Sequence, residues 1–300
     1  MRVLLTGASG LLGHRLVEEL CRRGYEVIAT YNRTPPMAKL GKVRWVKLDV
    51  TDTLSLEDLV LKSRPDVVIH AAAYTDVDGC EVNREYAWRV NVDATRSIVR
   101  ACRVVKSYII YISTDYVFDG EKGMYKEDDV PNPINFYGLT KLVAEEIVKC
   151  SDLLYTIVRT SAIYGVGPGK LNFATYVANK LMEGEEVRAV EDQYVSPTLN
   201  VALARAVAEL VEIRPMGVLH VAGERCSRYE FAKMIARLLG ANEDLVKPVK
   251  MRDMKWKARR PRDSSLDTSK ARDLISLTTV FDLRESLSIF IDEYRRWRGL

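Results

Sequence analysis

The sequence is poor in histidine and has no paired cysteine motif. Its 300 residues hold only three histidines and five cysteines. The cysteines lie far apart without a C-x-x-C pair, so neither a zinc site nor a disulfide framework is expected. So few histidines also disfavour a His-rich metal site or a Ser-His-Asp hydrolase. We therefore predict reduced cysteines, mostly in the core, and no bound metal.

Long apolar runs and a strong net charge are missing too. No apolar segment approaches the roughly 18 residues of a membrane-spanning helix, and Met1 leads into an apolar strand without a signal peptide. The net charge of +4, from 45 basic and 41 acidic residues, is too slight for a dedicated nucleic-acid binder. The sequence thus predicts a soluble, cytoplasmic protein with no membrane or nucleic-acid partner.

The charge is concentrated in one stretch. Residues 252–262 contain six basic residues and one acidic residue. An anionic ligand is therefore expected there first.

The first half of the chain alternates short β-branched runs with amphipathic stretches of helical length. This alternation is typical of a parallel sheet covered by helices on both faces. We predict an α/β fold with a Rossmann-type, doubly wound parallel sheet. The expected strands are 2–6, 25–30, 43–48, 66–70, 107–113 and 154–160, and the expected helices are 11–23, 54–63, 83–105 and 137–150.

The regular alternation of expected strands and helices ends after residue 165. We predict a nucleotide-binding domain over 1–165 and a smaller substrate lobe over 166–300. The two are expected to interleave, because a helix at 199–213 and a strand at 217–223 read as a return to the sheet. Further helices are expected at 228–239 and 282–298.

A glycine-rich turn follows the first strand. Gly7, Gly10 and Gly13 have G-x-x-G-x-x-G spacing and lead directly into a helix. Glycine allows a tight turn and close backbone approach, and a helix N-terminus favours a pyrophosphate. In this context we predict dinucleotide binding by the turn, with Ser9, Leu11 and Leu12 beside the glycines.

The end of the second strand bears on the choice of dinucleotide. It reads Tyr31-Asn32-Arg33, without the carboxylate that usually binds the ribose of NAD. Arg33, helped by Arg15, could instead pair with the 2′-phosphate of NADP(H), although a solvated loop arginine is the alternative. Asp49 and Val50 close the third strand and could hold the adenine; a simple strand-end turn is nearly as good a reading.

A Tyr-x-x-x-Lys pair places a phenol and an ammonium on one helix face. The chain has three such pairs, Tyr137/Lys141, Tyr176/Lys180 and Tyr229/Lys233. Only the first opens a helix after a proline-rich turn, downstream of a strand that ends in Ser113-Thr114-Asp115. The other two pairs are expected to be packing residues outside the cofactor half.

The predicted chemistry is reduction of a carbonyl. A cation about 4 Å from a phenol can lower its pKa substantially, so we expect Lys141 to lower the pKa of Tyr137 and also to hold the nicotinamide ribose. Tyr137 would donate a proton to the carbonyl oxygen, while the Thr114 hydroxyl polarises that oxygen. A surface Tyr and Lys on an amphipathic helix is the alternative.

These motifs resemble the extended short-chain dehydrogenase/reductases, and within them the dTDP-4-dehydrorhamnose reductase group. The similarity covers nearly the whole chain, and STDYVFDG and RPRDSSLD are specific to the group. The matching segments are TGASGLLG (6–13), HAAAYTDVDGCE (70–81), NVDAT (91–95), YISTDYVFDG (111–120), FYGLTKLVAEE (136–146), VRTSAIYG (158–165) and RRPRDSSLDTSK (259–270).

The resemblance implies roles for individual residues. Thr114, Tyr137 and Lys141 would be catalytic, and Asn91 would be either a part of the site or a buried amide bonded to backbone. The residues implied to contact the cofactor are Ala71, Ala72, Ala73 and the segment Thr160 to Ile163; those implied to face the substrate are Tyr74, Thr75, Asp115, Tyr116, and Gln193 with Pro197 and Thr198. In the basic run, Arg259, Arg260 and Arg262 are candidates for the diphosphate of a nucleotide sugar, or else solvated surface charge.

The resemblance implies an NADP(H)-preferring reductase of a nucleotide-linked 4-keto sugar, with dTDP-4-dehydro-L-rhamnose as substrate, and a possible homodimer. The motifs are also similar to the β regulatory subunit of methionine adenosyltransferase, through RRPRDSSLD to the helix FDLRESLSIFIDEYRRWR. A non-catalytic NADP-binding subunit with a synthetase partner is therefore one alternative. A nucleotide-sugar epimerase or dehydratase is another.

Overall fold

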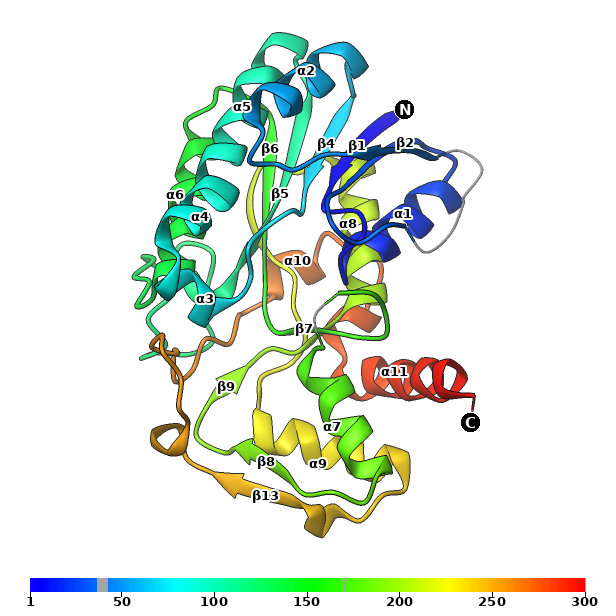
Figure 1. The fold of residues 1–300 in the computed structure, drawn as a ribbon, viewed down its shortest axis with the longest axis vertical. Helices are drawn as coiled ribbons and strands as arrows, with labels where there is room; N and C mark the ends of the chain where they lie inside the picture. The colour runs from blue at the N-terminus through cyan, green and yellow to red at the C-terminus, as the bar shows by residue number, and fades with distance from the viewer. Residues whose placement is uncertain (37–42, 170, 300) are drawn as a thin grey trace.

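A computed structural model describes residues 1–36, 43–169 and 171–299. In this part of the chain, seven parallel strands form one sheet in the order β11-β6-β5-β4-β1-β2-β3, which confirms the predicted fold class (Figure 1). The strands are β1 (Arg2–Thr6), β2 (Glu26–Tyr31), β3 (Val43–Lys47), β4 (Val67–His70), β5 (Tyr108–Thr114), β6 (Tyr155–Thr160) and β11 (Gly217–His220).

Helices cover both faces of the sheet. On one face lie α2 (Thr53–Ser63), α5 (Ala94–Val105) and α6 (Phe136–Lys149), and on the other lie α1 (Gly13–Arg22) and α8 (Asn200–Ile213). Every residue of β5 is consequently buried, as expected for a central strand of a parallel sheet. The edge strand β3 has no fully buried residue.

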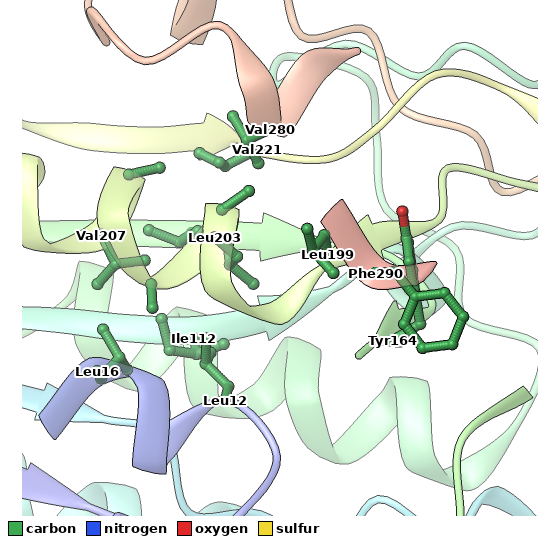
Figure 2. Packing of buried hydrophobic residues seen from close by; sticks show 14 of the residues in the cluster. Leu12, Leu16, Ile112, Tyr164, Leu199, Leu203, Val207, Val221, Val280 and Phe290 are labelled. Carbon is green, nitrogen blue, oxygen red and sulfur yellow. The ribbon is translucent and has the colours of Figure 1, made fainter. Parts of the chain in front are cut away.

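The larger core lies between the sheet and α8. Figure 2 shows Leu203 and Val207 of α8 packed between Leu16 of α1 and Ile112 of β5 on one side and Val221 on the other. All of these side chains are almost fully buried. The return of α8 and β11 to the sheet therefore closes this core, although these elements follow the smaller lobe's first elements in sequence.

One predicted helix is interrupted. The range expected as a single helix, 83–105, consists of α4 (Arg84–Trp88), a π-helical turn (Arg89–Asp93) and α5. A short helix α3 (Val77–Val82) precedes it. Because a π-helical turn adds a residue to the helical repeat, it changes the direction in which Asn91 points.

The smaller lobe is built from short elements between and after those of the sheet. Its strands β8 (Val187–Val190) and β13 (Val246–Val249) pair in parallel beneath the helices α7 (Phe173–Met182) and α9 (Arg228–Leu239) (Figure 1). Two-residue pairings join β7 (Ile163–Tyr164) with β10 (Thr198–Leu199) and β9 (Tyr194–Val195) with β12 (Cys226–Ser227). The remaining helices are α10 (Ser269–Arg272) and α11 (Leu283–Arg298).

All five cysteines are free thiols, three of them buried. No helix in the described residues is both long and apolar enough to cross a membrane. A cytoplasmic location stays a prediction of the sequence.

A fully buried ion pair joins α6 to β6. The Arg159 guanidinium donates to Glu145 from Nε (3.0 Å) and Nη2 (2.7 Å), and both side chains are almost inaccessible to solvent. Glu145 also accepts a hydrogen bond from Ser113 at 2.5 Å, and the Phe118 ring lies 5.0 Å from the guanidinium. The pair fixes α6 against the sheet directly behind the residues Tyr137 and Lys141.

Removing one partner of this pair should destabilise the protein strongly. We expect Glu145→Met to lower the free energy of unfolding by about 3–5 kcal/mol, because it leaves the Arg159 charge buried and unpaired. The double variant with Arg159→Met should lose much less than the sum of the two single changes. Denaturant unfolding of the four proteins measures this coupling; additive losses would contradict it.

Candidate active site

A cavity of about 670 Å³ opens at the carboxyl ends of the strands. The strand order reverses between β1 and β4, which is where ligands bind in open parallel sheets. Most residues predicted to contact the cofactor line this cavity, but Arg15 and Ser161 do not. Those that line it include Gly7, Ser9, Gly10, Leu11, Leu12, Gly13, Tyr31, Asn32, Arg33, Asp49, Val50, Ala71, Ala72, Ala73, Tyr137, Lys141 and Thr160.

The glycine turn presents bare backbone to the cavity. Gly7 has a positive φ of 70°, and a Cβ there would lie 2.8 Å from the backbone of Ala72. A Cβ on Gly13 would lie 2.1 Å from the carbonyl oxygen of Gly7. Among the described residues no side chain caps the first turn of α1, although the His14 N–H donates to the Gly10 carbonyl at 3.1 Å. This arrangement fits the pyrophosphate of a dinucleotide.

At the ends of β2 and β3, the cavity is lined by one acidic residue, Asp49, and one basic residue, Arg33. Asp49 accepts hydrogen bonds from Asn32 (2.9 Å) and from the backbone and hydroxyl of Thr51 (2.9 and 2.8 Å). Burial raises the pKa of Asp49, but these bonds and the charge of Arg33 outweigh it and hold the pKa below its usual value. The exposed Arg33 side chain lines the cavity.

Arg15 does not join Arg33, contrary to the expectation. Its guanidinium is engaged by Glu18 at 3.1 Å and by Glu293 of α11 at 2.9 Å. Arg15 is not among the residues that line the cavity. The ion pair instead fixes α11 against α1.

Thr114, Tyr137 and Lys141 meet in the cavity as predicted. Thr114 ends β5, and Tyr137 and Lys141 lie one turn apart at the start of α6, whose first turn is capped by Asn135. Because Asn135 ends the extended turn and begins the helix, the Tyr137 phenol is directed toward the end of β5.

The electrostatics of the pair differ from the prediction. The Lys141 Nζ donates to the carbonyl of Ile112 at 2.8 Å and lies 4.1 Å from the centre of the Tyr111 ring. Burial lowers the pKa of Lys141 to about 7, against the opposing charge of Glu145. Burial likewise raises the pKa of Tyr137, and the Thr114 hydroxyl beside it offsets only part of this. The expected lowering of the Tyr137 pKa by Lys141 is therefore wrong for this arrangement, because burial dominates.

Asp115 is a buried carboxylate bonded to three hydroxyl groups. It accepts hydrogen bonds from Thr114 (3.0 Å), Ser161 (2.8 Å) and Ser264 (2.5 Å). Burial raises its pKa, and these three hydroxyls act against that rise. Since the Thr114 proton points to Asp115, Thr114 would have to leave this bond in order to donate to a substrate oxygen.

Asn91 holds the backbone of Tyr74. Its Oδ1 accepts from the Tyr74 N–H at 2.8 Å, and its Nδ2 donates to the Tyr74 carbonyl at 3.3 Å and to the Thr140 hydroxyl at 3.0 Å. Asn91 is 1% exposed and does not line the cavity. Of the two readings of Asn91, the structure thus favours the buried amide, which positions the cavity-lining Tyr74.

The segment after β6 offers an unpaired polar atom. The Thr160 hydroxyl is buried and has no hydrogen-bond partner among the described residues, and Thr160, Ala162 and Ile163 line the cavity. A buried polar atom without a partner is costly, so this hydroxyl fits a polar group of a ligand such as the nicotinamide amide. Together with the glycine turn, it shows that the residues present fit NAD(P)(H).

The predicted substrate residues divide into two groups. Tyr74, Thr75, Asp115 and Tyr116 line the cavity, whereas Gln193, Arg259 and Arg260 do not. The Arg260 guanidinium pairs with Asp78 of α3 at 3.0 Å, and the Arg259 side chain is exposed to solvent.

Gln193 is fully buried behind the cavity, where its Nε2 donates to the carbonyl of Pro261 at 3.2 Å. Its Oε1 accepts from the Nε of Arg228 at 2.8 Å. Arg228 lines the cavity and was missed because it belongs to no motif. Its position at the start of α9, after the capping residue Ser227, was the only sequence signal.

The two other Tyr-x-x-x-Lys pairs lie outside the cavity. Tyr176 and Tyr229 pack against the core of the molecule, while Lys180 and Lys233 form ion pairs with Glu185 and Glu243. Of the three pairs, Tyr137/Lys141, which position along the chain had selected, is the one that lines the cavity.

Comparison with known proteins gives the family. The family described as "RmlD substrate binding domain" matches residues 1–296, nearly the entire chain. The chain belongs to the RmlD substrate binding domain family. This membership confirms the resemblance to the dTDP-4-dehydrorhamnose reductase group. The matched residues include all the motifs on which the resemblance rested.

Relatives in the RmlD family match over most of their length. The probable low-salt glycan biosynthesis reductase Agl14 of Haloferax volcanii is 36% identical over 276 residues, 90% of each chain. A crystal structure described as a hypothetical dTDP-4-dehydrorhamnose reductase from Sulfolobus tokodaii is 47% identical, with a TM-score of 0.84 over 95% of this chain and 99% of that one. The dTDP-4-dehydrorhamnose reductase of Bacillus anthracis, solved with NADP, is 33% identical, with a TM-score of 0.85 over 97% and 99% of the two chains.

The similarity to the regulatory subunit is also real. Methionine adenosyltransferase 2 subunit beta of Bos taurus is 30% identical over 309 aligned residues, which cover 99% of this chain and 90% of that protein.

The burial of Lys141 predicts a specific pH dependence of stability. Between pH 7 and its ordinary value of 10.5, the lysine is neutral when folded but charged when unfolded. Unfolding then takes up a proton, so this contribution to stability rises with pH in that window and is flat below pH 7. We therefore expect the difference in unfolding free energy between the cofactor-free protein and Lys141→Met to rise with pH above pH 7 and to be constant below it. Denaturant titrations over this pH range measure the difference.

The matched control for this measurement is Lys149→Met. Lys149 lies on the same helix but is partly exposed. Because Lys149 lacks the burial of Lys141, its substitution should not reproduce the rise expected with Lys141→Met. A flat curve for Lys141→Met as well would show that Lys141 keeps an ordinary pKa.

Proposed function

We propose that the protein is an NADP(H)-dependent reductase of a nucleotide-linked 4-keto sugar, which converts dTDP-4-dehydro-L-rhamnose to dTDP-L-rhamnose. The observation that carries the proposal is one cavity that contains both the glycine turn and the set of Thr114, Tyr137 and Lys141. The names of the relatives in the RmlD family support a nucleotide-sugar substrate.

The residues of the cavity suit proton donation to a reduced carbonyl. When bound, the nicotinamide would supply the hydride. Burial raises the Tyr137 pKa, so the phenol keeps its proton at neutral pH and can give it to the oxygen that gains negative charge. Thr114 is the second hydroxyl at that place, and Asp115 holds it in position. Lys141 lies beneath the site, and because burial lowers its pKa to about 7, its charged and neutral forms are both present near neutral pH.

The preference for NADP(H) over NAD(H) rests on Arg33. Arg33 lines the cavity just after β2, whose last residues Thr30 and Tyr31 carry no carboxylate. The carboxylate at this end of the cavity is Asp49 of the neighbouring strand end, which Asn32 and Thr51 engage. An arginine fork matches a phosphate in geometry and charge. The structure of the Bacillus anthracis relative, which contains NADP, supports this preference.

A regulatory subunit is the second candidate. The observation that favours it is the 30% identity to methionine adenosyltransferase 2 subunit beta over almost the whole chain. This candidate predicts that NADPH binds without being consumed and that a synthetase copurifies. A nucleotide-sugar epimerase would instead retain its cofactor through purification. A homodimer is a further expectation from the family.

The reductase proposal is tested by Tyr137→Phe. With NADPH and enzymatically prepared dTDP-4-dehydrorhamnose, we expect sugar-dependent loss of nicotinamide absorbance for the wild type. The variant lacks the phenolic proton, so its kcat should fall by about 10²–10⁴-fold with little change in NADPH affinity. The matched control, Tyr176→Phe, should keep wild-type kcat. A Tyr137→Phe protein with full activity would remove Tyr137 from the mechanism.

The cofactor preference is tested by Arg33→Ala. Loss of a charge-assisted contact with the 2′-phosphate should weaken NADPH binding by about 10- to 100-fold and leave NADH almost unchanged. Fluorescence titration of both nucleotides measures the two affinities. Arg44→Ala, an exposed arginine on β3 outside the cavity, serves as control. Equal losses for NADPH and NADH would argue against a phosphate contact.

A further inference from the structure

The cavity continues past the catalytic residues to Arg228. This residue lines both the main cavity and an adjoining recess of about 200 Å³, which is also lined by Phe173 and Phe231. On the side of the main cavity, Arg228 is close enough to Tyr116 for its positive charge to act on the phenol. Arg228 therefore stands where the catalytic part of the cavity meets the recess.

The orientation of Arg228 is fixed from behind. Its Nε donates to the Oε1 of the fully buried Gln193 at 2.8 Å, and the Phe173 ring lies 5.3 Å from the centre of its guanidinium. Gln193 is itself held, because its Nε2 donates to the carbonyl of Pro261 at 3.2 Å. With its Nε engaged by Gln193 and its side chain within hydrogen-bonding reach of the Tyr116 phenol, the guanidinium is held in a fixed orientation at the cavity wall.

The charge of Arg228 is not neutralised by the protein. Within the described residues, no carboxylate lies at ion-pair distance from it. The other cations among the described residues of the main cavity are Arg33, at the far cofactor end, and Lys141, whose Nζ donates to the Ile112 carbonyl. Arg228 is thus the cation available to an anionic ligand beyond the catalytic residues.

In the basic run, the charge of Arg260 also acts on the Tyr116 phenol, but its guanidinium is already engaged. Arg260 is paired with Asp78 at 3.0 Å and lies against Trp256, and the Arg259 side chain is exposed outside the cavity. What the run contributes to the site is a backbone carbonyl, that of Pro261, which holds Gln193. Arg259 and Arg260, which were expected to bind the diphosphate, are not among the residues that line the cavity.

We propose that Arg228, positioned by Gln193, binds the diphosphate of the nucleoside diphosphate sugar. The arginine fork pairs with two phosphate oxygens, and the sugar then extends from it toward Thr114 and Tyr137. The inference rests on the proposed function only in taking a nucleotide-linked sugar as the ligand. It requires no particular sugar and no turnover.

The test is binding of dTDP and UDP to the full-length protein saturated with NADPH, measured by calorimetry. Arg228→Gln should weaken both nucleotides by about 10- to 100-fold, as expected for loss of a charge-assisted contact. Arg228→Lys, which keeps the charge but loses the fork and the bond to Gln193, should give an intermediate loss. The matched control Arg259→Gln should bind like the wild type, and NADPH affinity should be unchanged in all variants.

Three results would overturn the inference: equal dTDP affinity of Arg228→Gln and wild type, an equal loss in Arg259→Gln, or no binding of either nucleotide to the wild type. Thermal unfolding of each variant shows whether the fold is intact, and Arg228→Lys decides if Arg228→Gln is unstable. A wild-type protein that binds dTDP through Arg228 but never oxidises NADPH would instead contradict the reductase proposal alone.

Discussion

The buried carboxylate of Asp115 is the constraint on which the site depends. A carboxylate away from water is stable only when hydrogen-bond donors surround it. Here the donors come from three separate parts of the chain: Thr114 at the end of β5, Ser161 after β6, and Ser264 near the end of the basic segment. Satisfying this one carboxylate therefore brings the sheet, the cofactor edge and the smaller lobe together at the Thr114 hydroxyl.

The segment 257–266 extends this connection in both directions. The backbone N–H groups of Lys257 and Ala258 donate to Asp78 of α3, and the carbonyl of Arg259 accepts from Asn135, the residue that caps α6. On the other side, the carbonyls of Pro261 and Arg262 accept from Gln193 and Tyr194. The segment thus connects the helix that carries Tyr137 to the lobe that carries Arg228. The segment makes these connections through its backbone, and Arg260 adds an ion pair with Asp78.

Burial has the largest effect on the pKa values of the ionisable groups in the site. Lys141, Tyr137 and Asp115 are all removed from solvent, and for each of them desolvation is the largest influence on the pKa. In each case burial shifts the pKa toward the neutral form, and for Asp115 the three hydroxyl donors act against that shift.

The sequence by itself determined the sheet, the glycine turn and which Tyr-x-x-x-Lys pair lines the cavity. These features depend on local order: apolar periodicity fixes strands and helices, and a strand followed by a turn and a helix fixes the direction of nearby backbone groups. The interruption near Asn91 was not visible, because the π-helical turn alters neither the apolar pattern nor the residue types.

Only the tertiary structure decided which charges are free. Arg15, Arg33, Arg228, Arg259 and Arg260 look equivalent in sequence, and the difference among them is the partner that folding brings near. Arg15 forms an ion pair with Glu293, and Arg260 forms one with Asp78. Arg228 instead donates to Gln193, an uncharged side chain that orients it without neutralising its charge. Such pairings join residues far apart in the chain, so composition and spacing carry no record of them, and the balance between desolvation and pairing that sets each charge exists only in the folded molecule.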